Sequence, residues 1–372
     1  MAFKKQFLVL FLFGLMSGCS GGDDGKDTKV SANNSTQVAR SELPGNLSTL
    51  PLPDITNQPL TLRVANVVNP RFKNLSDYQI QEILLRTQQL VKQHFKVEIN
   101  FSDVEVLDIK DVFKTLKPNV IKERVNLIVD IDFISDEDRE IMQSGIFKTL
   151  SNYSKDKQKV IDYAQPYLLH PEIQQTSFID LSYALVDTLL ARLQYWKKLK
   201  AADGKPIIDA TKYNEWVWWD SLGYGDFPYE VVLTNQLVAS AEYYDMDVHS
   251  SIRGGVSAGT TSYSRNALLS TYVYIMVYPM LNNTELLTTL RNDESYNETQ
   301  IINYSAALLT HELGHMLLHL GHPFGDVSCI MSPTTMLNYR DWYDNLDSTK
   351  CAIGSRSEMV PGVVKIGYYR QW

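Results

Sequence analysis

Four of the chain's seven histidines, His311, His315, His319 and His322, stand within twelve residues of one another. Imidazole is a common zinc ligand. On an α-helix, His311 and His315 lie one turn apart and about 40° around the axis. Both rings can therefore reach one tetrahedral ion, and the spacing predicts a zinc site.

Glu312 stands directly beside the first of these histidines. It is too close in sequence to be the usual third ligand, but it can take a proton from a water that the metal activates. Zinc lowers the pKa of such a water toward ~7. Glu312 is therefore predicted to be the general base of a hydrolytic reaction.

The third ligand requires the chain to turn back. On a straight helix at ~1.5 Å per residue, His319 would lie ~12 Å from His311 and His322 ~16 Å from it. Gly321 and Pro323 flank His322 and are typical helix-stop residues. These signals favour His322 as the third ligand and leave His319 as a residue that lies at the surface or contacts a ligand without binding the metal.

The run His311-Glu-Leu-Gly-His315-Met-Leu-Leu-His319-Leu-Gly-His322 resembles the metzincin clan of zinc peptidases, whose pattern is His-Glu-x-x-His-x-x-Gly-x-x-His. One extra residue precedes the reversal here, and His319 stands where the family has its glycine. Cys329-Ile-Met331-Ser-Pro333 resembles the family's Met-turn, at about the spacing of matrixins and archaemetzincins. The resemblance is specific over residues 299–333.

This resemblance implies a zinc-dependent endopeptidase that acts on a peptide or protein substrate. Zn²⁺ would be held by His311, His315 and His322, and Met331 would pack beneath it without binding it. The resemblance also implies that a strand at 270–278 precedes the active-site helix, and that residues 230–233 lie near the sheet edge that binds extended substrate.

Two alternatives stay open. In a gluzincin-type peptidase an acidic side chain would be the third ligand, and the candidates are Asp326, Asp341, Asp344 and Glu358. The chain could instead be a non-catalytic zinc-binding surface lipoprotein. Tyr339 and Tyr343 are further candidates to stabilise an oxyanion, although packing is the more common role of such tyrosines.

The patterns along the chain predict an α+β fold: a zincin-like domain with a mixed twisted sheet, an active-site helix and a helical insertion. Strands are expected at 60–68, 97–106, 125–133 and 270–278, and an amphipathic helix from Ser76-Asp77 to about Phe95. A capping-box pattern at Ser295–Glu298 predicts the start of the active-site helix.

The helical insertion is expected at about 135–220. It ends in a cluster of Trp216, Trp218 and Trp219, which is expected to pack in the core and could alternatively line a substrate site. The Gly-rich stretch 253–259 lacks the ending of a phosphate-binding loop and is interpreted as a flexible turn.

The N-terminus predicts export. Residues 1–18 combine lysines with an apolar run and end before Cys19, which resembles the lipobox of bacterial lipoprotein signals. Cys19 would carry a lipid anchor to the membrane, with the outer membrane as the expected location, and residues 19–59 would be a flexible tether. The metallopeptidase-like domain is expected to span 60–372.

The cysteines and the net charge add two further predictions. Cys329 and Cys351 are the remaining cysteines of an exported chain, and they are candidates for a disulfide that would stabilise by ~3 kcal/mol. The net charge of -8 argues against nucleic acid as a partner.

Overall fold

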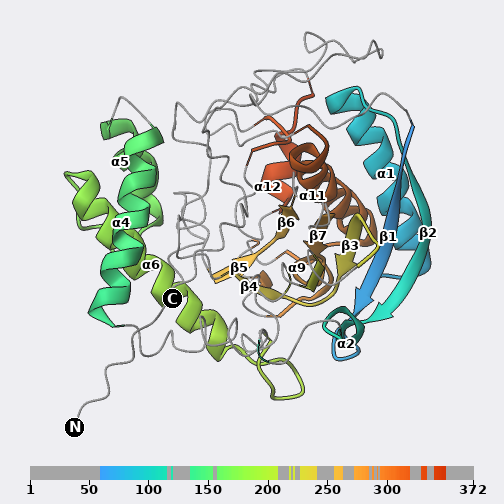
Figure 1. Cartoon of the computed structure of the whole chain (residues 1–372), viewed down its shortest axis with the longest axis horizontal. Helices are drawn as coiled ribbons and strands as arrows, with labels where there is room; N and C mark the ends of the chain where they lie inside the picture. The colour runs from blue at the N-terminus through green and yellow to red at the C-terminus, as the bar shows by residue number, and fades with distance from the viewer. Residues whose placement is uncertain are drawn as a thin grey trace.

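The computed structural model describes residues 59–114, 119, 135–153, 157–207, 218, 221–222, 227–240, 255–262, 272–284, 287–288, 291, 294–318, 328–332 and 339–348. The main sheet of this part has five mostly parallel strands, and helices pack on it (Figure 1). This mixed content agrees with the predicted α+β class. The predicted strand at 125–133 and residues 1–58 lie outside the described residues.

The first half of the sheet is a strand–helix–strand unit. β1 (Leu60–Val68) and β2 (Ile99–Asp108) pair in parallel, and α1 (Asp77–Phe95) connects them. Ser76 caps α1 in a reciprocal capping box with Gln79. The bounds predicted for β1 and α1 are confirmed, and β2 begins two residues later than predicted because Lys96 ends the helix in the left-handed region.

The strand order is β2-β1-β3-β7-β6. β3 (Val231–Thr234) pairs in parallel with β1 on one side and with β7 (Tyr272–Met276) on the other. The prediction that residues 230–233 lie near the substrate-binding edge is therefore wrong. All four β3 side chains are buried, as is usual in a central parallel strand.

The end strand beside β7 is β6 (Gly259–Ser262), which runs antiparallel to it. A small second sheet pairs β4 (Val238–Ser240) with β5 (Gly255–Ser257). Residues 255–259 were interpreted as part of a flexible turn, and that interpretation is wrong, since most of them lie in β5 and β6. Glycine within a strand often marks a bulge, a bend or the close approach of another group.

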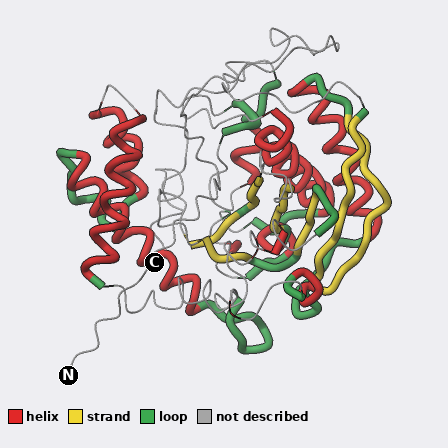
Figure 2. Tube along the Cα trace, viewed as in Figure 1, coloured by secondary structure: helices red, strands yellow, loops and turns green. Residues whose placement is uncertain are grey.

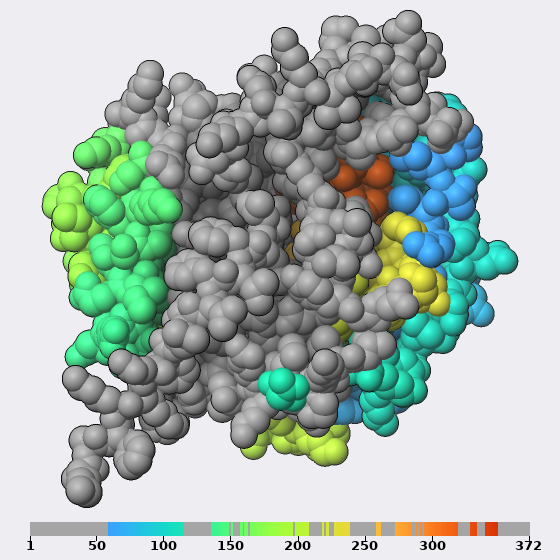
Figure 3. All heavy atoms as spheres, viewed as in Figure 1, coloured from blue at the N-terminus to red at the C-terminus, as the bar shows by residue number. Residues whose placement is uncertain are grey.

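Helices dominate the described part of the predicted insertion. α4 (Asp136–Tyr153), α5 (Lys157–Ala164), the 3-10 helix η3 (Gln165–Tyr167) and α6 (Phe178–Lys198) follow one another, and α4 packs on α6. These helices lie on the opposite side of the molecule from β1, β2 and α1 (Figure 3). The helical character predicted for this stretch is confirmed over the described residues.

The sheet separates two groups of buried side chains. One face carries Leu62, Val64 and Leu233 and packs against α1 and α11 (Glu298–Leu318) (Figure 2). The other face carries Ala65, Val67 and Tyr274 and is covered by α2 (Ile109–Val112) and Trp218. The alternation along β1 follows from the two-residue period of a strand.

Trp218 is fully buried on the second face, with its ring 5.3 Å from that of Tyr274 and 5.7 Å from that of Phe113. It lies on the face of the sheet opposite α11. The packing interpretation of this tryptophan is therefore correct, and Trp216 and Trp219 lie outside the described residues.

Two short helices flank α11 in sequence: α9 (Tyr278–Leu281) after β7, and α12 (Tyr339–Asp344). The capping box of α11 is formed by Asn297 and Gln300, each side chain accepting from the other's backbone N–H at 2.9 Å. The prediction of a box at Ser295–Glu298 is wrong by two residues, because Asn297 is the residue that directly precedes the first turn. Within the described ranges, no helix has both the length and the apolar character needed to cross a membrane.

Candidate metal and catalytic site

Two of the three predicted zinc ligands, His311 and His315, lie on a helix that is buried on nearly every side. From Tyr304 to Leu318 every residue of α11 is buried, including the polar side chains of Thr310, His311, Glu312 and His315. Ala306, Ala307, Leu308 and Leu309 favour helix in the preceding turn. Burial of polar groups carries a cost unless each finds a partner, so the partners define the site.

The two imidazoles face each other. The Nε2 atoms of His311 and His315 are 3.1 Å apart, and the ring planes meet at 86°. Two nitrogen ligands at ~2.0–2.1 Å from a tetrahedral zinc would lie about 3.3 Å from each other. The pair therefore fits two of the ligand positions of such an ion.

A backbone carbonyl sets the tautomer of His311. Its Nδ1 lies 2.8 Å from the carbonyl oxygen of Ile330. A carbonyl can only accept, so Nδ1 carries the proton and donates it, which leaves the Nε2 lone pair directed at His315. Histidines that bind metals commonly have their second nitrogen held in this way.

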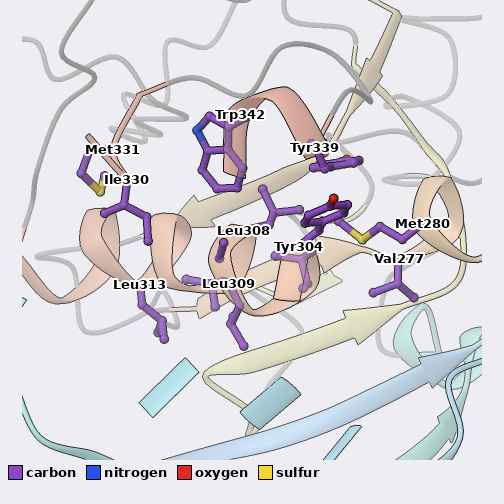
Figure 4. Packing of buried hydrophobic residues seen from close by; sticks show 14 of the residues in the cluster. Val277, Met280, Tyr304, Leu308, Leu309, Leu313, Ile330, Met331, Tyr339 and Trp342 are labelled. Carbon is purple, nitrogen blue, oxygen red and sulfur yellow. The ribbon is translucent and has the colours of Figure 1, made fainter. Parts of the chain in front are cut away.

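The turn that contains Ile330 packs against α11 from Cys329 to Ser332, and the Ser332 N–H donates to the carbonyl of Cys329 at 2.9 Å. A Cβ placed on Gly314 would lie 2.4 Å from Met331 Sδ and 2.7 Å from Phe95 Cζ. Met331 therefore lies directly against the helix between the two histidines, and glycine at 314 permits this approach. Figure 4 shows Ile330 and Met331 together beside α11.

Trp342 of α12 contacts both His311 and the turn that contains Ile330. Its ring centroid is 6.3 Å from that of His311, and its Nε1–H donates to the carbonyl of Ser332 at 3.2 Å. The same side chain thus contacts a predicted ligand and holds the turn. Trp342 is not predicted from the sequence, because a tryptophan eleven residues after Met331 carries no recognisable signal.

Glu312 faces the sheet. Its carboxylate Oε2 accepts from the Thr261 hydroxyl at 2.7 Å, and the same hydroxyl is 2.8 Å from the Glu312 carbonyl oxygen. A Cβ on Gly259 would lie only 2.7 Å from Glu312 Oε1. Neither β6 residue is predicted from the sequence, because the Gly-rich stretch that ends at Gly259 has no pattern that identifies it as a strand beside Glu312.

Several predicted site residues lie outside the described part: Cys19, His319, His322, Asp326, Cys351 and Glu358. Among the residues that are described, no three His, Cys, Asp or Glu side chains form a group able to hold a metal. Asp341 and Asp344 therefore do not join His311 and His315, and Asp344 lies 3.6 Å from Arg340 Nε with an exposed side chain. This removes two of the four acidic candidates.

Cys329 is disulfide-bonded. Its Sγ also accepts from the Met331 N–H at 3.3 Å, next to the turn that touches His311. The pairing of Cys329 with Cys351 stays a prediction.

The two candidate oxyanion tyrosines pack away from the imidazoles. The Tyr343 ring centroid is 5.4 Å from that of Tyr304, with the ring planes at 56°, and the Tyr343 hydroxyl is 3.5 Å from Arg86 Nη2. Tyr339 is fully buried and lies close to Tyr304 (Figure 4). Tyr304 is two helical turns, ~10 Å, before His311, so these contacts favour packing for both tyrosines.

The chain matches no protein-family model and no curated protein sequence. Among solved structures, it matches an archaemetzincin from Methanopyrus kandleri at 14% sequence identity, over 78% of this chain and 89% of that one, with a TM-score of 0.27. A score this low carries no argument about function.

Proposed function

We propose that the chain is a zinc-dependent peptidase related to the metzincins. The observation that carries the proposal is the convergence of the His311 and His315 Nε2 atoms to 3.1 Å, with the His311 tautomer set by Ile330. The packing of Met331 against Gly314 supports the relation to the metzincins, since that clan has a Met-turn beneath its metal.

His322 is the proposed third ligand. α11 is helical to Leu318, and the chain is back beside His311 at Ile330. A reversal between these residues is what ligation by His322 requires, and His322 lies in that interval. Asp326 lies there too and is the competing acidic ligand, with Glu358 further along the chain.

Glu312 is the proposed general base. It would accept a proton from the attacking water and deliver it to the amine that leaves when the peptide bond breaks. Bound zinc would supply the Lewis acidity that makes water a nucleophile near neutral pH. The side chain is 3% exposed, which limits its contact with bulk water.

The test measures zinc content and peptide hydrolysis on the same preparation. Glu312→Ala should retain one equivalent of zinc and lose about 10²–10⁴-fold in rate. Glu298→Ala, which removes an exposed carboxylate from the first turn of the same helix, is the matched control and should retain both. Zinc with no cleavage of a broad peptide library by wild type would instead support a non-catalytic zinc protein.

The third ligand is tested by comparing His322→Ala with His319→Ala. Only the first should weaken zinc binding sharply, because on a straight continuation of the helix His319 would lie ~12 Å from His311 along the axis. Loss of zinc from Asp326→Ala or Glu358→Ala, with His322→Ala unaffected, would identify the gluzincin-type alternative.

The proposed location is the bacterial outer membrane, at its periplasmic or surface face, through a lipid on Cys19. Support comes from the apolar run before Cys19 and the polar segment after it. Mass spectrometry of the mature N-terminus should find a diacylated Cys19, and Cys19→Ser should release the protein from the membrane fraction. An unmodified N-terminus elsewhere in residues 17–30 would indicate ordinary secretion.

A further inference from the structure

The carboxylate of Glu312 rests on one strand. Gly259 and Thr261 are alternate residues of β6, so they project to the same face of that strand, and both meet Glu312. The Thr261 hydroxyl is 2.7 Å from Oε2, and a Cβ on Gly259 would be 2.7 Å from Oε1 and 3.0 Å from Cγ. We call these two residues the β6 seat.

The β6 seat is itself held in place. Thr261 pairs with Val273 of β7, a fully buried central strand, and its own exposed fraction is 3%. A β-branched side chain has few rotamers, so the direction of the hydroxyl follows from the strand. The Cβ that Gly259 lacks would also approach the Tyr274 carbonyl oxygen to 3.0 Å, which the sheet backbone cannot relieve.

We propose that Thr261 is a positioning residue that orients the Glu312 carboxylate, and that Gly259 provides the space for it. The inference depends on the proposed function, because it assigns Thr261 a role through the general base. A general base acts only within hydrogen-bond reach of its proton, and a displacement of about 1 Å can cost ~10²-fold in rate. The hydrogen bond from the Thr261 hydroxyl restrains the rotation of the Glu312 side chain.

Thr261→Val removes the hydroxyl and keeps the shape. It should lower kcat by roughly 10- to 100-fold, with KM and zinc content unchanged, because the hydroxyl is buried and directed at Glu312. Thr261→Ser restores the donor and should return kcat to within a few-fold of wild type. A general loss of packing would lower the kcat of both variants alike.

A double-mutant cycle with Glu312→Ala tests whether Thr261 affects the rate through Glu312. In the Glu312→Ala background, Thr261→Val should lower the residual rate no further, because the group that Thr261 orients is absent. Thermal unfolding is a second readout that does not need activity: Thr261→Val should lower Tm more when the Glu312 carboxylate is present than in Glu312→Ala, where the hydroxyl keeps only the carbonyl oxygen of residue 312 as an acceptor.

The outcomes separate the two proposals. Wild-type kcat in Thr261→Val, or additive Tm shifts, would overturn the positioning role even if the chain is a peptidase. If wild type binds zinc and cleaves nothing, the proposed function fails, and with it the catalytic purpose of the seat. Coupled Tm shifts would then still establish that Thr261 holds Glu312.

Discussion

α1 and α11 pack side by side on the same face of the sheet, but they differ in what they bury. α1 buries an apolar stripe and leaves charged side chains such as Lys92 at the surface, where it pairs with Glu98. α11 buries almost its entire circumference, including two histidines and a glutamate. α1 buries few polar groups, and one of them, Thr87, donates to the carbonyl of Ile83 within the same helix. His311 and Glu312 of α11 instead meet partners from other segments.

The largest expected contrast is in packing. Leu309→Ala in α11 removes a fully buried side chain and should lower the free energy of unfolding by about 2–5 kcal/mol. Leu85→Ala in α1, where the leucine is 49% exposed, should change it by less than about 0.5 kcal/mol. Urea unfolding of both variants measures the contrast, and equal losses would contradict the difference between the helices.

His94 is the exception on α1, a buried titratable side chain in its last turn. Burial, with a smaller contribution from Lys96, lowers the pKa of His94 from 6.5 to about 4. The unfolded chain therefore binds a proton at higher pH than the folded one, and the stability due to neutral His94 is present above pH ~6.5 and is lost as pH falls toward ~4.

The size of this loss should approach roughly 3 kcal/mol, at about 1.4 kcal/mol per pKa unit. Urea unfolding of wild type and His94→Leu at pH 7.5 and pH 5 tests it. The variant should lose less stability than wild type between the two values. An identical pH dependence in both proteins would show that His94 does not titrate in this range.

Gly314→Ala tests the contact between α11 and the turn at Met331. Alanine in a helix interior is intrinsically favoured by about 1 kcal/mol, but the new Cβ would meet Met331 Sδ and Phe95 Cζ within 2.7 Å. Overpacking should outweigh propensity, giving a net loss of about 1–2 kcal/mol and weaker zinc binding. Stability equal to or above wild type would mean that Met331 and Phe95 move to accommodate the new Cβ at little cost in free energy.

The smallest expected effects are at the N-terminal caps, where α1 and α11 should lose similar amounts of stability. Ser76→Ala and Asn297→Ala each remove one partner of a capping box, and each should cost about 1 kcal/mol. Chemical denaturation of the two variants gives the comparison. A loss several times larger at Asn297 would mean that the start of α11 is coupled to the site far more than its exposed position indicates.

Local patterns predicted much of this molecule. The apolar period of α1 and the β-branched run of β1 identified both elements and their bounds, because such signals need no knowledge of the rest of the chain. The capping box of α11 was misplaced by two residues, since Ser295 and Asn297 are both good caps and only the start of the helix decides between them.

The sequence by itself determined that His311 and His315 share one face of a helix with Glu312 beside them, because helical geometry follows from spacing alone. Only the tertiary structure decided what meets these side chains. The carbonyl of Ile330, the hydroxyl of Thr261 and the space at Gly259 come from segments 19 to 53 residues away in sequence, brought there by strand order and packing. Strand order also put β3 at the centre of the sheet and β6 beside Glu312, since pairing between distant strands depends on contacts that no local pattern encodes.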